Sequence, residues 1–393
     1  MSSITIKPIL PDCFFALMLA PVRGMSEKPG VPFLFVYGSF GGATMGRAVL
    51  RGIAVVIALL LLVLAAGLVY RAWRQHEVAQ THAIKSPPGI DEASFVKIGG
   101  IDQFVQIRGD DRANPVLLFV HGGPGISMVG LTVVQWDQRG DGKTYGRNRG
   151  AAEAPSMTID RMTEDGIEVA EYLRAHLHKQ KIVLLGHSWG TVLGVRMIKA
   201  RPDLFSAYVA TGELVAKQDN ELTSYNIVLD LARAAHNSQA VKELEAIRPP
   251  PYKDLDTLLV QRKWMDVYDL PSERNLFRDL TPTVAFAPNY SLRDIYDMQM
   301  ATAFSQHILF DELNDFDARP LGLDFQVPFF IFQGDEDLNT PTALARDYFA
   351  TLHAPVKQLV ILKGAGHDAV MTVSDAFLKE LVVHVRPVAI QRN

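Results

Sequence analysis

Hydrophobic residues follow three different patterns along the 393 residues of the chain. Near the N-terminus, Gly52–Tyr70 forms one continuous apolar run. From residue 94, short apolar runs alternate with amphipathic stretches of helical period. Residues 213–325 interrupt this alternation with mostly helical patterns. The sequence therefore predicts a membrane segment, a strand–helix core and a helical insertion within that core.

The run Gly52–Tyr70 contains 19 residues and no charged side chain, and two arginines precede it and two follow it. As a helix it would be about 28 Å long, close to the ~30 Å hydrocarbon core of a bilayer. A buried core helix and a cleaved signal peptide are the alternatives, but the run is unusually apolar for the first and long for the second. We expect a transmembrane anchor over 49–71, an N-terminal extension over 1–48 and a polar linker over 72–93.

The orientation of this anchor is weakly encoded. Because arginines flank both of its ends, the positive-inside rule gives almost no preference. A single N-terminal anchor followed by a large domain favours export of that domain. We expect a single-pass membrane protein whose main domain lies on the exported side.

Eight apolar runs of strand length follow the linker. Helical stretches such as Thr163–His176 and Thr191–Lys199 lie between several of them. This alternation is typical of a mostly parallel sheet covered by helices on both faces. We predict an α/β fold whose core comprises residues 94–212 and 326–393. The candidate strands are Ser94–Ile98, Gln103–Arg108, Val116–Val120, Leu131–Trp136, Lys181–Leu185, Ala207–Thr211, Val327–Phe332 and Gln358–Leu362.

Composition and charge narrow the class of protein. With 48% hydrophobic and 21% charged residues, the chain is globular with an apolar surplus. Its net charge of −4 gives no support for a nucleic-acid binder. The single cysteine, Cys13, excludes an internal disulfide, a thiolate zinc site and an iron–sulfur cluster.

A candidate nucleophile lies in Gly186-His187-Ser188-Trp189-Gly190, which follows the apolar strand KIVLL and opens the helical stretch TVLGVRMIKA. A serine flanked in this way is typical of a strained strand-to-helix turn, in which larger neighbours would clash. The alternative is an ordinary turn of small residues, which would not require this context. The pattern predicts Ser188 as the nucleophile and the backbone N–H of Trp189 as one oxyanion donor.

A serine nucleophile needs a base. Where the serine lies on a strand-to-helix turn of this kind, the histidine follows both the serine and the acid in the chain. His367 is the best placed, because it follows the strand QLVIL in a glycine-rich loop near the C-terminus. His384 lies in the apolar run LVVHV and is expected to pack. The backbone direction is expected to point His187 away from the serine side chain. We predict His367 as the base.

The base needs an acid that orients it. The strand VPFFIF leads into GDEDLNTP at 334–341, where carboxylates lie at the carboxyl end of the strand. Asp337 is the preferred acid. Asp335 and Glu336 remain alternatives, and a solvated loop is the ordinary role for both.

Five motifs together resemble the proline iminopeptidase branch of the α/β-hydrolases, over roughly residues 94–390. They are HGGPG at 121–125, WDQRG at 136–140, GHSWGT at 186–191, GDEDLNTP at 334–341 and GAGH at 364–367. Members of this branch remove N-terminal residues, often proline, from peptides. The resemblance implies a triad of Ser188, Asp337 and His367, an oxyanion hole from Gly123 and Trp189, loop-fixing roles for Asp137 and Arg139, and neither a metal nor a cofactor.

The chain departs from this branch in two places. His187 stands where iminopeptidases more often have glycine. Only Ile126–Gly130 separate Gly125 from the next strand, where relatives carry a helix. A parallel crossover usually needs a dozen or more residues. The spacing therefore predicts that this helix is missing or collapsed, and a catalytically impaired or purely binding protein is one alternative.

The insertion at 213–325 lies where such hydrolases carry a cap over the active site. Helical patterns cover Glu221–Ala235, Asp254–Tyr268 and Leu292–His307. An aminopeptidase needs a carboxylate to hold the free ammonium of its substrate. Glu213 is the best placed, since it follows a strand end, and it is also an alternative triad acid. Other carboxylates of the cap, for which a solvated helix face is the ordinary role, are Glu221, Asp256, Asp266, Asp294 and Glu312.

These patterns together predict a serine hydrolase that acts through an acyl-enzyme. The expected activity is that of an aminopeptidase of the proline iminopeptidase type, with a peptide or small molecule as substrate. An esterase or amidase that uses the same triad on uncharged substrates is the alternative. A requirement for a free N-terminal amine distinguishes the two.

Overall fold

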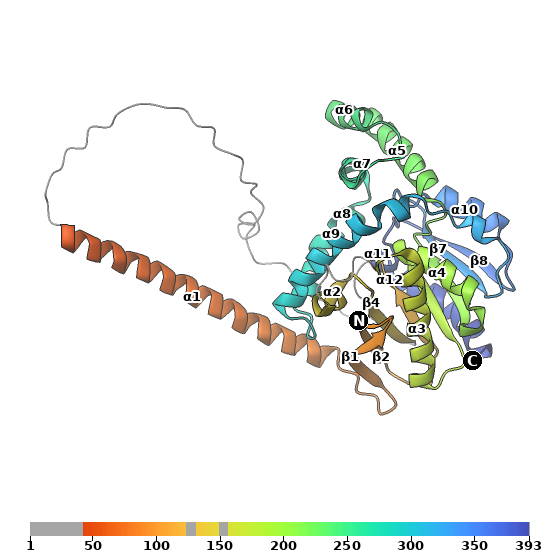
Figure 1. Ribbon diagram of the computed structural model, residues 1–393, viewed down its shortest axis with the longest axis horizontal. Coiled ribbons are helices and arrows are strands. Elements are labelled where there is room, and N and C mark those ends of the chain that lie inside the picture. Colours follow the sequence, from red (N-terminus) through yellow and green to blue (C-terminus); the bar gives the residue numbers. More distant parts are fainter. Residues whose placement is uncertain (1–41, 123–130, 149–155, 393) are drawn as a thin grey trace, which may run out of the picture. The chain divides into compact units, whose positions relative to one another are not determined.

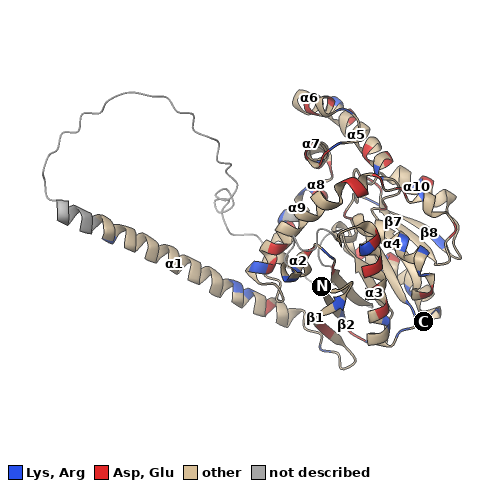
Figure 2. Cartoon of the chain, in the orientation of Figure 1, with Lys and Arg blue, Asp and Glu red and all other residues tan. Residues whose placement is uncertain are grey.

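The computed structural model describes residues 42–122, 131–148 and 156–392, in two compact units, Met1–Ala65 and Ala66–Asn393. The described part of the first unit belongs to helix α1 (Gly42–Thr81). Within α1, Val49–Thr81 is long and apolar enough to cross a membrane, and its most apolar stretch has no buried residue. Figure 2 shows α1 almost without charge until its C-terminal part.

The linker predicted over 72–93 is wrong at both of its ends. Helix α1 continues to Thr81, and the first strand begins at Ile90, so only 82–89 are irregular. The residues after the apolar run contain Ala, Arg, Gln and Glu, which are strong helix formers, and neither proline nor glycine until Pro87.

Residues 70–75 of α1, which belong to the second unit, also make tertiary contacts. Arg71 donates hydrogen bonds to the carbonyl oxygens of residues 285 and 290, at 3.0 and 2.6 Å. Gln75 donates to the carbonyl oxygens of residues 287 and 290, at 2.7 and 2.9 Å. The rings of Tyr70 and Phe286 meet edge to face with centroids 5.8 Å apart. Residues 70–75 are therefore part of the folded unit.

The eight predicted strands form one sheet in the order β1-β2-β4-β3-β5-β6-β7-β8 (Figure 1). β1 and β2, and β2 and β4, pair antiparallel, and the other neighbours pair parallel. The strands are β1 (Ile90–Ile98), β2 (Ile101–Gly109), β3 (Val116–Val120), β4 (Thr132–Asp137), β5 (Ile182–His187), β6 (Phe205–Thr211), β7 (Phe329–Gly334) and β8 (Lys357–Leu362). β3 and β4 are joined through 123–130, which lie outside the described residues, so the missing helix there stays a prediction.

Helices cover both faces of this sheet, because the central strands are apolar on both sides. On one face Leu173, Val192 and Tyr348 belong to the core, from α3 (Ile159–Leu177), α4 (Trp189–Ala200) and α10 (Thr342–Thr351). On the other face Phe377 and Ala389 belong to a second core cluster. The elements there are α11 (Ala369–Thr372), α12 (Ser374–Glu380), a π-helical turn Leu381–Val385 and α13 (Arg386–Gln391).

A buried ion pair fixes the turn after β4. Arg139 is 2% exposed, and its guanidinium donates to both carboxylate oxygens of Asp165 on α3, at 2.8 and 3.1 Å. It also donates to the carbonyl oxygen of Gly99, at 3.0 Å, in the turn between β1 and β2. The loop-fixing role that the family resemblance implies for Arg139 agrees with these contacts.

The cap is inserted between β6 and β7 and contains five α-helices, followed by a 3₁₀ turn at Arg319–Leu321. The predicted helical patterns correspond to α5 (Lys217–Ala234), α7 (Leu255–Tyr268) and α9 (Leu292–Asn314). Two further helices, α6 (Ser238–Ile247) and α8 (Pro271–Ala285), were not predicted from the sequence. α8 begins with Pro271 and contains Pro282. Because proline is disfavoured inside helices, Pro282 argued against a helix there. The short helix α2 (Gly142–Asn148) follows β4.

Candidate active site

The turn at Ser188 joins β5 to α4 in a conformation that few residues adopt. Its φ of 53° and ψ of −119° lie outside the regions allowed to most side chains. A side chain on Gly190 would lie 1.9 Å from the carbonyl oxygen of Val120, and one on Gly186 would lie 2.7 Å from that of Gly190. Both positions therefore need glycine, and the turn projects Ser188 from the carboxyl edge of the sheet.

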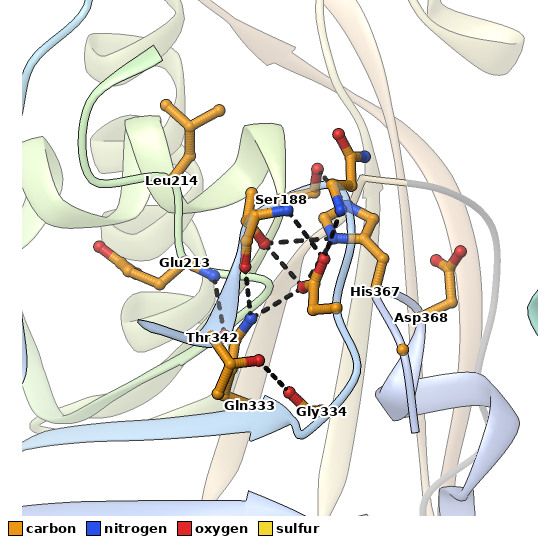
Figure 3. A network of polar contacts seen from close by, with 12 residues as sticks. Ser188, Glu213, Leu214, Gln333, Gly334, Thr342, His367 and Asp368 are labelled. Carbon is orange, nitrogen blue, oxygen red and sulfur yellow. Dashed lines mark hydrogen bonds and ion pairs between the residues drawn. The ribbon is translucent and has the colours of Figure 1, made fainter. Parts of the chain in front are cut away.

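The structure brings the three predicted triad residues into contact through His367, and Figure 3 shows Ser188 and His367 side by side. His367 Nε2 lies 2.8 Å from Ser188 Oγ, and His367 Nδ1 lies 3.0 Å from Asp337 Oδ2. The three residues come from the end of β5, the loop after β7 and the loop after β8. Each distance is that of a hydrogen bond, as proton transfer from the serine requires.

The Asp337 carboxylate is held by its own loop. Its Oδ1 accepts the backbone N–H groups of Asn339 and Thr340, both at 2.8 Å. Its Oδ2 accepts from the Thr340 hydroxyl and from the Gln333 amide, both at 2.8 Å. Asp335 instead accepts N–H groups of the loop after β8, at 2.8 Å from Gly364. The structure thus brings Asp337, and not Asp335, into hydrogen-bond contact with His367.

Electrostatics favour an ion pair between acid and base. Burial opposes the charged form of Asp337, but His367 and the hydrogen bonds outweigh it and hold the pKa of this carboxyl below its usual value. Burial also opposes the charged form of His367, but Asp337 outweighs it and raises the pKa of the imidazole to about 9. The pair is therefore well suited to stabilise the imidazolium that forms when the serine gives up its proton.

His187 contacts the loop of His367, which the sequence analysis did not foresee. Its Nε2 lies 3.2 Å from the carbonyl oxygen of His367, and the two rings have centroids 5.1 Å apart. Burial lowers the pKa of His187 to about 3, so it is neutral and donates to that carbonyl. His384 does not pack in the core as predicted, because it is partly exposed and pairs with Glu380 at 2.9 Å.

The predicted oxyanion hole is described in part. Gly123 lies outside the described residues, so its role stays a prediction. The backbone N–H of Trp189 belongs to the first turn of α4, where donors point out of the helix. The Trp189 indole donates to Gln138 at 3.0 Å, and the Gln138 amide donates to the carbonyl oxygen of His121 at 3.2 Å. Gln138 thus links the elbow to the start of the HGGPG loop.

Glu213 is not brought to the triad. Its backbone N–H donates to Gln333 at 3.2 Å, while Figure 3 shows its carboxylate pointing away from Ser188 and His367. The side chain is buried, and burial raises the pKa of Glu213 to about 8. A neutral, enclosed carboxyl cannot hold a substrate ammonium, so neither of its predicted roles is supported.

Three of the other cap carboxylates make structural contacts. Glu221 is buried and pairs with Lys217 and Arg262. Asp294 completes the capping box of α9 with Ser291. Glu312 accepts the backbone N–H of residue 159 at 2.9 Å. Asp256 and Asp266 lie on α7, and Asp266 is exposed.

Two cap residues near the triad were missed. Asp269 lies between α7 and α8, and it interacts electrostatically with Asp337 and His367. Burial, reinforced by Glu273 and Asp337, raises the pKa of Asp269 to about 7. Glu273 on α8 accepts backbone N–H groups on both sides of His367. The signal available in the sequence was Pro271 with an acidic residue two positions later, which is typical of a helix start.

The arrangement can perform acyl transfer: a hydroxyl nucleophile, a base within hydrogen-bond distance and a buried acid behind the base. Among the described residues, no group of three or more His, Cys, Asp or Glu side chains is placed to hold a metal ion.

Comparisons with known proteins identify the family of the chain. Residues 117–380 match the model of the alpha/beta hydrolase family. A Bacillus subtilis (strain 168) protein named "Probable aminopeptidase YbaC" is 31% identical over 310 residues, which cover 74% of this chain and 95% of that protein. A "Probable proline iminopeptidase" of Streptomyces coelicolor is 26% identical over 298 residues, covering 69% of this chain and 87% of its own.

The fold is also found among solved structures. The proline iminopeptidase-related protein TTHA1809 of Thermus thermophilus superposes with a TM-score of 0.53 at 19% identity, covering 76% of this chain and 99% of its own. At this identity the likeness concerns the fold alone. Together with the family match over residues 117–380, it leaves one conclusion: the chain belongs to the alpha/beta hydrolase family.

Proposed function

We propose that the protein is a serine hydrolase that removes N-terminal residues from peptides, as proline iminopeptidases do. The observation that carries the proposal is the unbroken line of contacts from Ser188 Oγ through His367 to Asp337, at 2.8 and 3.0 Å. Relatives named as aminopeptidases support the peptide substrate. An esterase or amidase with the same triad is the second candidate, and the substrate experiment below separates the two.

The reaction follows from the positions of these atoms. His367 Nε2 takes the proton of Ser188 as Oγ attacks the carbonyl carbon of the first peptide bond. The negative charge that develops on the carbonyl oxygen is stabilised by the N–H of Trp189 and a donor from the loop after β3. The imidazolium then gives its proton to the leaving amine, and an acyl-enzyme remains on Ser188. Water, activated by the same imidazole, releases the N-terminal residue.

Asp269 takes the place of Glu213 as the residue that binds the substrate ammonium. It is a partly exposed carboxylate of the cap that interacts electrostatically with the triad, and its elevated pKa reflects burial beside other acids. A bound ammonium would relieve that repulsion and restore the charged carboxylate.

The helix α1 anchors the protein in a membrane, and the catalytic unit lies on the exported side. The apolar run is longer than the core of a signal peptide. The end of this run at Tyr70 and the residues after it up to Gln75 belong to the folded unit through their contacts with residues 285–290.

The first prediction concerns the nucleophile. A fluorophosphonate probe is expected to label Ser188, with fluoride as the leaving group, and mass spectrometry identifies the adduct. His367→Ala should slow labelling by about 10²–10⁴-fold, because the serine loses its base. His384→Ala is the matched control and should label like the wild type. Absence of labelling in the folded wild-type protein would disprove the proposed function and favour an impaired or binding protein.

The second prediction concerns pH. Only the neutral imidazole accepts the serine proton, so kcat/KM should rise with pH and level off above about pH 9, where His367 loses its proton. Asp337→Asn removes the charge that raises this pKa, so the curve should move to lower pH while kcat falls about 10⁴-fold. Labelling rates measured from about pH 5 to about pH 10, a range that includes the ordinary pKa of histidine, test both expectations. An unshifted curve in Asp337→Asn would contradict the assignment.

The third prediction separates peptidase from esterase. Asp269→Asn should raise KM for a prolyl anilide with a free amine by about 10–100-fold, because a charge-assisted hydrogen bond contributes roughly 1.5–3 kcal/mol. Hydrolysis of the N-acetylated or ester analogue should stay unchanged. Asp266→Asn, on the exposed face of α7, is the control. Equal turnover of free and blocked substrates by the wild type would instead identify the protein as an esterase or amidase.

The fourth prediction concerns the anchor. The full chain should stay in the membrane fraction after alkaline carbonate washing and leave it in detergent. Replacing Leu60 and Leu61 by arginine should abolish this retention, since each arginine costs about 2.5–3.5 kcal/mol at the centre of a spanning helix. Replacing both by isoleucine should not. Protease added outside sealed cells should degrade the catalytic unit, and complete protection would reverse the proposed orientation.

A further inference from the structure

One cap side chain reaches the loop that carries His367. Glu273, in the first turn of α8, is 8% exposed. Its Oε1 accepts the backbone N–H of Gly366 at 3.1 Å and the hydroxyl of Thr372 at 3.0 Å. Its Oε2 accepts the backbone N–H of Asp368 at 3.0 Å. The carboxylate therefore binds the residues immediately before and after His367.

The contact is close as well as polar. A side chain on Gly366 would lie 2.7 Å from Cγ of Glu273, so the loop and α8 are pressed together at this point. Hydrogen bonds to a carboxylate are shorter and about twice as strong as those between neutral groups. Burial and the neighbouring Asp368 raise the pKa of Glu273. Burial thus disfavours the charge of this carboxylate, and its hydrogen bonds offset that effect only in part.

The loop needs such support because its own backbone is permissive. Gly364 has a φ of 68°, and Gly366 follows two residues later, so the sequence alone leaves many conformations open. Asp335, from the end of β7, fixes the first part through the N–H of Gly364 at 2.8 Å. Glu273 fixes the second part. One support comes from the core, and the other comes from the cap.

We propose that Glu273 is a positioning residue through which the cap holds His367 in line with Ser188. The proposal rests on the proposed function of Ser188, His367 and Asp337. Glu273 touches neither the serine nor the imidazole; it binds the backbone on both sides of the base, and its charge also contributes to the raised pKa of His367. It follows that the base is in place only while α8 is seated on the loop after β8, so the seating of the cap controls the chemical step as well as substrate access.

A positioning residue is distinguished from a residue that only stabilises the fold by its effect on the maximal labelling rate. Misplacing a base by about 1 Å costs on the order of 10²-fold in rate. A glutamine keeps one carbonyl oxygen for one of the two N–H groups, and its amide opposes the other. The losses should therefore increase from wild type to Glu273→Gln to Glu273→Ala, in the maximal rate and not in the affinity for the probe.

The test measures fluorophosphonate labelling of Ser188 in the full chain as a function of probe concentration. Glu273→Ala should lower the maximal labelling rate about 10²-fold and Glu273→Gln about tenfold, with the half-saturating probe concentration unchanged. Glu312→Ala is the matched control, because Glu312 is also a cap carboxylate that accepts a core N–H, at 2.9 Å, away from His367. Its labelling rate should equal that of the wild type, and thermal melting compares the stability of all four proteins.

The outcomes distinguish this proposal from the proposed function. Maximal rates for both Glu273 variants equal to that of Glu312→Ala, or a change confined to probe affinity, would overturn the positioning role alone. Absence of labelling in the wild type would overturn the proposed function and this proposal with it. If Glu273→Ala does not fold, the nearly isosteric Glu273→Gln decides by the same comparison.

Discussion

The strained turn at Ser188 is the constraint on which the rest of the site depends. Its positive φ exists because Gly186 and Gly190 let β5, α4 and β3 approach within distances that no side chain would allow. The backbone N–H of Ser188 donates to the carbonyl oxygen of Thr211 at 3.0 Å, so β6 holds the turn from the other side. The packing of three buried strands thus stabilises a conformation that the segment alone would not keep.

The other two triad residues are brought to this turn by buried polar groups. Gln333 holds the loop of Asp337. Its amide donates to Asp337 and to the carbonyl oxygen of Thr340, and its carbonyl oxygen accepts from the backbone N–H of Glu213. One side chain at the end of β7 therefore connects the acid loop to the end of β6 (Figure 3). Hydrogen bonds in a buried site are stronger than in water, so these bonds help to fix the acid behind a base that lies 2.8 Å from Ser188 Oγ.

Helix α8 connects two regions that the sequence keeps far apart. Its first turn contacts the loop of His367 through Glu273. Its last residue, Ala285, accepts a hydrogen bond from Arg71 at 3.0 Å, directly after the apolar run of α1. The cap therefore contacts both the segment that follows the proposed anchor and the loop of the proposed base.

The sequence by itself determined the strands, the family and the triad candidates, because each is encoded locally: apolar runs of strand length, a serine between glycines at a strand-to-helix turn, and a histidine in a glycine-rich loop. It assigned 72–93 to a linker and Glu213 to the substrate, since neither the contacts of Arg71 nor the direction of the Glu213 carboxylate has a local pattern. Only the tertiary structure decided that Asp337 faces His367, that His187 binds its carbonyl and that Glu273 supports its loop. These contacts join residues separated by 30, 180 and 93 to 99 positions, and such pairs are set by packing and not by neighbouring residues.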